Sequence, residues 1–100
     1  MATKLSVPAA FELSQNYPNP FNPVTKISFA VPVESDVELS IYNVLGQKVT
    51  TLAKETKEPG YYNVIWEGKD SEGKDVPSGV YFYKMTADGF SSTMKMILMK

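Results

Sequence analysis

Apolar and polar residues alternate along most of this chain with a period of two. Three segments show the alternation most clearly: TKISFAV (25–31), DVELSIYN (36–43) and YYNVIW (61–66). Their apolar sets are Ile27, Phe29 and Val31; Val37, Leu39 and Ile41; and Tyr62, Val64 and Trp66. A period of two places successive side chains on opposite faces of a β-strand. These segments are therefore predicted to be strands with one face in a core and the other in water.

Two later segments are apolar on both faces. GVYFYKMTA (79–87) sets Tyr81, Tyr83 and Met85 against Val80 and Phe82, so the sequence does not decide its inward face. STMKMILM (92–99) sets Met94, Met96 and Leu98 on one face against Lys95, Ile97 and Met99 on the other, so the second face is apolar apart from its lysine. We expect this last strand to be deeply paired within a sheet or covered by another part of the chain.

Turn signals separate these segments. Gly46 in NVLGQK is expected at positive φ, Pro59 and Gly60 precede the third strand, and Asp88-Gly89 is typical of a two-residue type I′ hairpin. With a further short strand around residues 11–13, the pattern predicts about seven antiparallel strands and no helix. This arrangement is typical of an all-β, immunoglobulin-like β-sandwich. The cysteines of antibody-type domains are absent from the sequence.

The segment NYPNPFNP (16–23) is unusually rich in proline. Proline fixes φ, donates no hydrogen bond and pushes the preceding residue toward extended geometry. We therefore predict a stiff extended segment that runs along a sheet edge or crosses between sheets. The rings of Tyr17 and Phe21 are expected to be buried as anchors. A plain rigid corner between two strands is the simpler alternative.

Composition narrows the function classes. One hundred residues with 43% apolar and 21% charged residues fit one globular domain. The net charge of −1 argues against nucleic acid or an anionic membrane as the main partner. No apolar run is long enough to cross a membrane, so no membrane span is predicted. The chain contains no cysteine and no histidine, which removes thiolate chemistry and the commonest general base.

Candidate chemistry is confined to one polar segment, EGKDSEGKD (67–75). Calcium requires six to eight oxygen ligands, so a calcium site would have to draw on Asp70, Glu72 and Asp75. The interspersed Lys69 and Lys74 favour a solvated turn instead. The serine and threonine hydroxyls have no histidine to activate them. We predict no catalytic residue, no metal site and no cofactor, and we expect that the protein is not an enzyme.

Aromatic residues make up 12% of the chain and suggest a second kind of site. A carbohydrate-binding module would need an exposed planar row of rings, for which Tyr61, Tyr81 and Tyr83 are the candidates. In a sandwich this small, most aromatic rings are instead expected to lie in the core.

Four motifs occur in a single order over residues 11–100: LSQNYPNPFNPVTKISFAVP, VELSIYNVLGQKVTTL, GYYNVIWEGKDSEGKDVPSGVYFYKM and STMKMILMK. Together they closely resemble the type A C-terminal sorting domain of the type IX (Por) secretion system, found in the Bacteroidetes and related phyla. The IYNVLGQKV and WEGKDSEGKDVPSGVYFY patterns are also similar to the immunoglobulin-like domain of flagellar hook-capping proteins.

The resemblance implies a non-catalytic sorting signal. Such a domain directs a covalently fused N-terminal passenger, an enzyme or adhesin, through the type IX outer-membrane translocon for release or cell-surface attachment. The implied partners are the translocon and a sortase-like signal peptidase, and the implied location is secreted or on the cell surface. A structural spacer of the hook-capping type and a carbohydrate-binding accessory module stay open as alternatives.

The marked positions of the sorting family transfer to this chain residue by residue. They are Tyr17, Pro18, Asn19, Pro20, Phe21, Asn22, Pro23, Leu45, Gly46, Val49, Gly60, Trp66, Ser78, Gly79, Val80, Tyr81, Lys95, Met99 and Lys100. We expect residues 1–10 to be the remnant of a linker behind an added start, and residues 11–100 to be the sorting domain. The cleavage site is expected in that linker. Lys95 and Lys100 form a candidate handle by which a receptor could add a strand.

Overall fold

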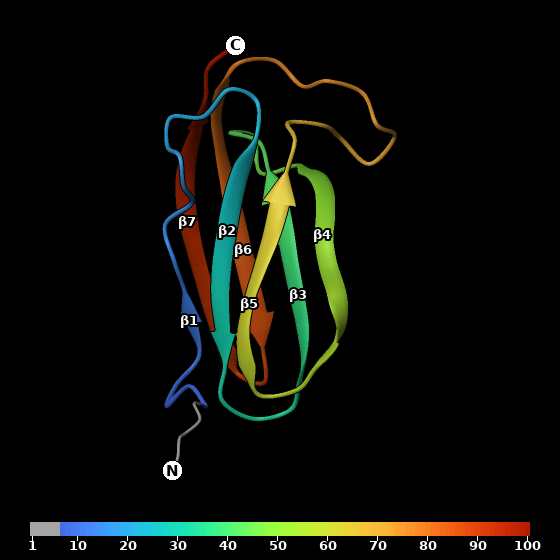
Figure 1. Ribbon diagram of the computed structural model, residues 1–100. Helices are drawn as coiled ribbons and strands as arrows, with labels where there is room; N and C mark the ends of the chain where they lie inside the picture. The colour runs from blue at the N-terminus through green and yellow to red at the C-terminus, as the bar shows by residue number, and fades with distance from the viewer. Residues whose placement is uncertain (1–6) are drawn as a thin grey trace.

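The computed structural model describes residues 7–100, which form two antiparallel β-sheets packed face to face and no helix (Figure 1). The strands are β1 (Glu12–Leu13), β2 (Thr25–Val31), β3 (Ser35–Tyr42), β4 (Lys48–Lys57), β5 (Gly60–Trp66), β6 (Gly79–Ala87) and β7 (Phe90–Leu98). One sheet has the order β1-β2-β5 and the other has the order β4-β3-β6-β7. The predicted immunoglobulin-like sandwich is confirmed. No helix in the described residues is long and apolar enough to cross a membrane.

The strand faces follow the alternation of the sequence. The predicted inward positions of β2 and β3 are all buried, and Trp66 of β5 is 2% exposed. In β6, Tyr81, Tyr83 and Met85 are buried, which settles the face that the sequence left open. Lys84 fixes this choice, because it lies on the same face as Val80 and Phe82 and its charge must reach water.

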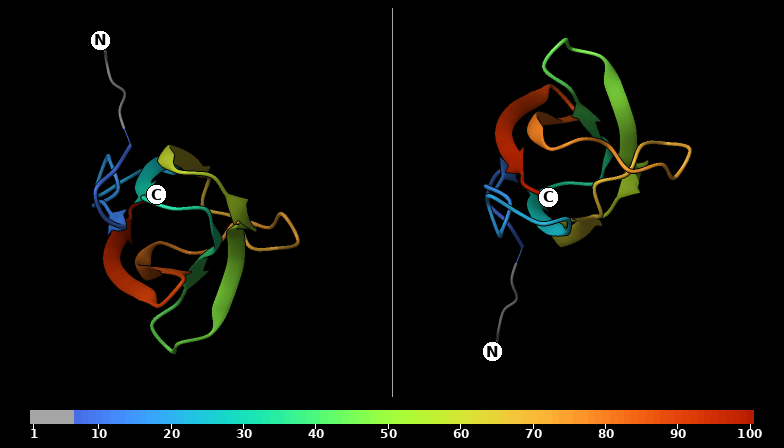
Figure 2. Two further views of the ribbon diagram at one scale, coloured as in Figure 1. Left: turned by 90° about the horizontal axis from the view of Figure 1, so that it is seen from below. Right: turned by 90° about the horizontal axis from the view of Figure 1, so that it is seen from above.

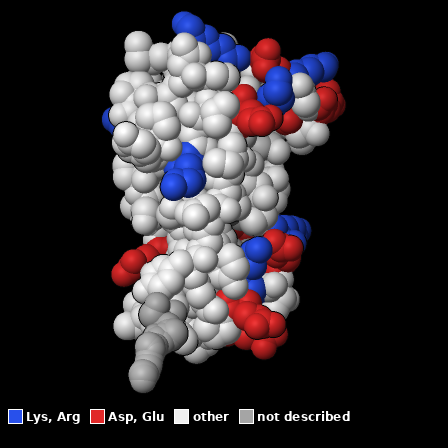
Figure 3. Space-filling view, viewed as in Figure 1, with Lys and Arg blue, Asp and Glu red and all other residues white. Residues whose placement is uncertain are grey.

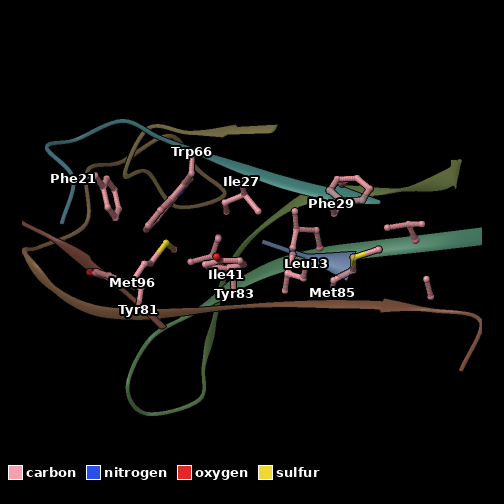
Figure 4. Close-up of a cluster of buried hydrophobic side chains, with 14 of the residues drawn as sticks. Leu13, Phe21, Ile27, Phe29, Ile41, Trp66, Tyr81, Tyr83, Met85 and Met96 are labelled. Carbon is pink, nitrogen blue, oxygen red and sulfur yellow. The ribbon is translucent and has the colours of Figure 1, made fainter. Parts of the chain in front are cut away.

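One continuous cluster of side chains fills the space between the sheets (Figure 4). Its buried members are Leu13, Phe21, Ile27, Phe29, Val31, Val37, Leu39, Ile41, Ala53, Trp66, Val76, Tyr81, Tyr83, Met85, Ala87, Met96 and Leu98. Members come from every strand and also from the proline-rich segment and the long loop between β5 and β6. These two connecting segments therefore contribute to the core and do not lie only on its surface.

The predicted turns are present. Gly46 has a φ of +80°, and its amide donates to the carbonyl oxygen of Asn43 at 3.0 Å. Ala87 pairs with Phe90 across the β6–β7 hairpin, and the two residues between them, Asp88 and Gly89, both have positive φ. Positive φ at both central positions is the mark of the type I′ turn.

The two ends of the described chain lie at opposite ends of the sandwich (Figure 1). We call the end that holds Lys100 the carboxyl end. The loops 43–47 and 67–78 also lie there. Views along the strands show the two sheets facing each other (Figure 2). The expected linker at 1–10 falls largely outside the described residues, so the domain limits and the cleavage site stay predictions.

Candidate functional site

Residues 14–24, called here the strap, connect β1 to β2 and lie beside β7 (Figure 1). On one side the strap pairs with β2. The amide of Ser14 donates to the carbonyl oxygen of Ser28 at 2.9 Å, and Tyr17 and Lys26 exchange two backbone hydrogen bonds of 2.9 Å each. The strap therefore continues the three-stranded sheet beyond β1.

On its other side the strap bonds to the outer edge of β7. Two of these hydrogen bonds involve strap side chains: Gln15 Nε2 donates to the Lys95 carbonyl at 2.9 Å, and the Ile97 amide donates to Asn19 Oδ1 at 3.0 Å. The other two join backbones: the Phe21 amide donates to the Ile97 carbonyl at 3.0 Å, and the Met99 amide donates to the Phe21 carbonyl at 2.8 Å. The strap thus runs along an edge and also joins the two sheets, as predicted. Its peptide bonds before Pro18, Pro20 and Pro23 are cis. The last strand is covered, as its apolar composition indicated.

A buried amide organises the strap from within. Asn16 is 2% exposed, and its Nδ2 donates to the Pro18 carbonyl at 3.1 Å and to Thr25 Oγ1 at 2.9 Å. The Thr25 hydroxyl in turn donates to the same Pro18 carbonyl at 2.9 Å. The buried role of Asn16 was not predicted from the sequence. The run of prolines could have indicated it. Prolines have no N–H group to form regular strand pairing, so carbonyl groups in such a segment need side-chain hydrogen-bond donors.

Three motifs that are distant in sequence meet in one aromatic cluster, formed by Phe21, Trp66 and Tyr81 (Figure 4). The centroids of Phe21 and Trp66 are 5.7 Å apart, and those of Trp66 and Tyr81 are 5.4 Å apart with the rings nearly perpendicular. Trp66 Nε1 donates to the Lys69 carbonyl at 2.9 Å, and the Tyr81 hydroxyl donates to the Pro77 carbonyl at 2.6 Å. Burial raises the pKa of Tyr81. The cluster therefore anchors the strap and the long loop together.

The expected burial of Tyr17 is wrong, since its side chain is 76% exposed. Tyr17 lies directly opposite Lys26 in an antiparallel pair, and opposed residues project to the same face of a sheet. Because Lys26 is exposed to water, the ring of Tyr17 is exposed beside it. The expected burial of Phe21 is confirmed at 2% exposure.

Most of the remaining marked residues lie at one end of the sandwich or the other. Leu45, Gly46, Gly79 and Lys100 lie at the carboxyl end, where Leu45 is 78% exposed and the Lys100 amide donates to Ser78 Oγ at 2.9 Å. Gly60 begins β5 at the opposite end. An apolar hollow of about 300 Å³ lies beside Leu45 at the carboxyl end, and its lining includes Val44, Val49, Val76, Pro77 and Val80.

The proposed handle for strand addition meets an obstacle. Lys95 and Lys100 are both exposed, but the outer edge of β7 between Lys95 and Met99 already bonds to the strap. A strand added along those residues would have to displace the strap. Covered edges of this kind protect sheet proteins from unwanted pairing.

The acidic residues of the long loop organise that loop. Asp70 Oδ1 accepts hydrogen bonds from the Glu72 and Lys74 amides at 2.9 and 3.0 Å, and Lys69 pairs with Asp75 at 2.8 Å. The hydrogen bond from Lys74 lowers the pKa of Asp70. Within residues 7–100, no three acidic, histidine or cysteine side chains gather closely enough to hold a metal. Charges of both signs collect over this loop, whereas the strap, which contains no charged residue, forms a neutral surface (Figure 3).

The aromatic row needed by a carbohydrate-binding module is absent from the described surface. Tyr81 and Tyr83 are 5% and 0% exposed, and only Tyr61 of the three candidates faces water. Tyr83 instead donates its hydroxyl to the Ser14 carbonyl at 2.6 Å, which ties β6 to the start of the strap. Burial raises the pKa of Tyr83 to about 12.

Comparison with known families identifies the domain type. The family model of the FlgD Ig-like domain matches residues 16–90, three quarters of the chain. The chain belongs to this family. FlgD from P. aeruginosa has a solved structure with 28% identity and a TM-score of 0.54, covering 75% of this chain and 60% of that one. The immunoglobulin-like family indicated by the second and third motifs is thereby confirmed, and no enzyme family is indicated.

Two further solved structures share the fold of this FlgD Ig-like domain. Dimeric latent PorU from Porphyromonas gingivalis has a TM-score of 0.70 and 17% identity, covering 90% of this chain and 9% of its own. PorZ from the same organism, an essential surface component of the type IX secretion system, has a TM-score of 0.57 and 19% identity over 90% of this chain and 11% of its own. The chain thus corresponds to a small part of each of these two proteins. No curated protein sequence matches it.

Proposed function

We propose that this FlgD Ig-like domain is a C-terminal sorting signal for type IX secretion. It would direct a fused N-terminal passenger through the outer-membrane translocon for release or attachment to the cell surface. Its partners would be the translocon and a sortase-like signal peptidase. The domain would carry no chemistry of its own and would act as a ligand and substrate of that machinery.

The observation that carries the proposal is the convergence of the marked residues. Motif residues from the start, the middle and the end of the chain meet where Phe21, Trp66 and Tyr81 pack and where Phe21 bonds to Ile97 and Met99. A set of motifs that jointly builds the region around the C-terminus suits a signal read at that end. The folds of PorU and PorZ support the proposal by likeness of architecture.

An export assay tests the proposal. A periplasm-directed fluorescent protein is fused ahead of residues 1–100 and expressed in a type IX-competent host and in a translocon-deficient twin. Surface or medium fluorescence in the competent host alone is the expected result. Periplasmic retention in both hosts, with the domain shown to be folded, would contradict it.

Variants of surface residues then distinguish recognition of the domain by the export machinery from its folding. Val44→Ala removes an exposed valine at the carboxyl end, and Val33→Ala removes a comparable one (51% exposed) in the turn between β2 and β3. We expect Val44→Ala, Leu45→Ala and Lys100→Ala to reduce export while the melting temperature stays constant, and Val33→Ala to leave export unchanged. Lys95→Ala tests in the same way, by export and melting temperature, whether the exposed lysine of the last strand is recognised.

A structural spacer is the second candidate function, favoured by the 28% identity to FlgD. A spacer would fold and hold neighbouring domains apart without being recognised at its carboxyl end. Export failure by a folded fusion, together with neutral surface variants at both ends, is the outcome that this candidate predicts.

A further inference from the structure

Residues 11–21 follow the last strand, β7, along its whole length. The ring of Phe11 stacks on Phe90 at the start of β7, with centroids 5.4 Å apart. Gln15 bonds to Lys95 in the middle of β7, and Phe21 bridges to Leu98 at its end in parallel orientation. Residues 11–21 and β7 therefore run side by side in the same direction (Figure 1).

This arrangement determines how the fold responds to a pulling force applied to its two termini. The N-terminal side of residues 11–21 lies at one end of the sandwich, and the C-terminal side of β7 lies at the other. A pull that separates the termini drives the two neighbours to slide past each other. Hydrogen bonds between sliding neighbours are strained together, whereas bonds between strands peeled apart from one end break one at a time.

We propose that residues 11–21 and β7 form a mechanical clamp, which makes the domain resist unfolding when force is applied between its termini. The clamp consists of the four strap–β7 hydrogen bonds, reinforced by the Tyr83 hydroxyl on the Ser14 carbonyl. On the far side, β1 and Tyr17 pair with β2, so the segment is held between both sheets.

The buried ring of Phe21 adds to the clamp. The backbone of Phe21 makes two of the strap–β7 hydrogen bonds. Its side chain is 2% exposed and packs against the ring of Trp66. The strap cannot slide along β7 unless this ring leaves the aromatic cluster. Forced unfolding is governed by the unfolding rate, so a clamp that must fail in one step raises the force needed. The clamp does not depend on the proposed export role.

Single-molecule force spectroscopy on the full chain tests the clamp. Because the chain has no cysteine, an introduced one gives a unique attachment point. The first geometry pulls between the two termini. The second pulls between Val24→Cys and the C-terminus, which both lie at the carboxyl end, so that contacts peel in sequence. We expect the unfolding force to be at least about twofold higher in the first geometry at the same pulling rate. Equal forces would overturn the proposal.

A matched pair of variants assigns the resistance to the strap. Asn19→Ala removes the side-chain acceptor of the Ile97 amide, and Asn63→Ala removes the acceptor of the Ser28 hydroxyl, which joins β2 to β5 outside the clamp. Between the termini, Asn19→Ala is expected to lower the unfolding force and Asn63→Ala to leave it unchanged. An equal loss in both variants, or none in Asn19→Ala, would assign the resistance to the sandwich as a whole and overturn the clamp.

Discussion

The amide of Met99 donates to the carbonyl oxygen of Phe21 at 2.8 Å, which joins the end of the last strand to the proline-rich segment. The Phe21 amide returns a bond of 3.0 Å to the carbonyl of Ile97. The ring of the same residue packs against Trp66 in the core. Phe21 thus joins the proline-rich segment to the last strand through its backbone and to the middle of the chain through its side chain.

Phe21→Ala is predicted to destabilise the domain by about 3–5 kcal/mol, because it removes a buried ring and leaves a cavity. In a domain of this size, such a loss lowers the melting temperature by more than about 10 °C. Thermal or urea unfolding measures it.

Tyr17→Ala is the control within the same motif. Its ring is 76% exposed, so we expect a change in stability within about 0.5 kcal/mol. A large loss for Tyr17→Ala, or a negligible one for Phe21→Ala, would contradict the assignment of the anchor.

Tyr83 makes stability fall at high pH. Its pKa is raised from 10.0 to about 12 in the folded protein, so between these values the unfolded chain loses the proton while the folded chain keeps it. The stabilisation is fully present below pH 10 and is lost as pH rises toward 12. The difference corresponds to about 2–3 kcal/mol.

Tyr83→Phe should flatten this alkaline limb when unfolding is measured at pH values from 8 to about 12. At neutral pH the variant should lose about 1 kcal/mol, since the bond to the Ser14 carbonyl disappears. At neutral pH the control Tyr61→Phe, on an exposed tyrosine, should change stability by less than about 0.5 kcal/mol. An unchanged limb in Tyr83→Phe would argue against this residue as its source.

Gly68→Ala is predicted to be more destabilising than Gly73→Ala. Both glycines have positive φ, +72° and +82°, which costs an alanine about 1–2 kcal/mol at either site. At Gly68 a Cβ would also lie 3.3 Å from the carbonyl oxygen of Pro23 at the end of the strap, whereas the site of Gly73 is open. Melting temperatures of the two variants test the difference, and equal losses would show that the strap yields without cost.

Asp70 should hold the long loop closed in a pH-dependent way. The Lys74 and Glu72 amides bond to its carboxylate and lower its pKa below the ordinary 3.8. The stabilisation of the folded state by the Asp70 carboxylate is present above pH 3.8, and it is lost as the pH falls through the lower pKa that Asp70 has in the folded protein. Asp70→Asn is expected to speed hydrogen exchange of those two amides at neutral pH.

Asp75→Asn is the control for the loop, because it breaks the ion pair with Lys69 and leaves both turn amides bonded. If both variants speed exchange of the two amides equally, the loop depends on its overall charge and not on the cap provided by Asp70.

Much of the sandwich could be predicted from the sequence, because the information is local. The alternation around Ile27 and Leu39 fixes which side of each strand is buried, and Asp88-Gly89 fixes a hairpin. Where two faces were both apolar, as around Tyr83, the deciding residue was Lys84, a signal already present in the sequence.

The strap shows where local information ends. Its prolines predict an extended edge segment, but they do not say which strand lies beside it or which ring points inward. The exposure of Tyr17 follows from its pairing with Lys26, and the covering of β7 follows from Asn19 and Phe21 reaching that edge. Both depend on contacts that form only in the complete fold. The packing of Phe21, Trp66 and Tyr81 against one another could not be predicted for the same reason.

The separation of the two chain ends has a consequence for fused proteins. The molecule is 47 Å long and about half as wide, and its N-terminal side and Lys100 lie at opposite ends of that length. A folded neighbour joined ahead of residue 7 therefore starts a full sandwich length from the exposed Leu45 and Lys100. Even a bulky neighbour at that position would leave the surface around Leu45 accessible to solvent.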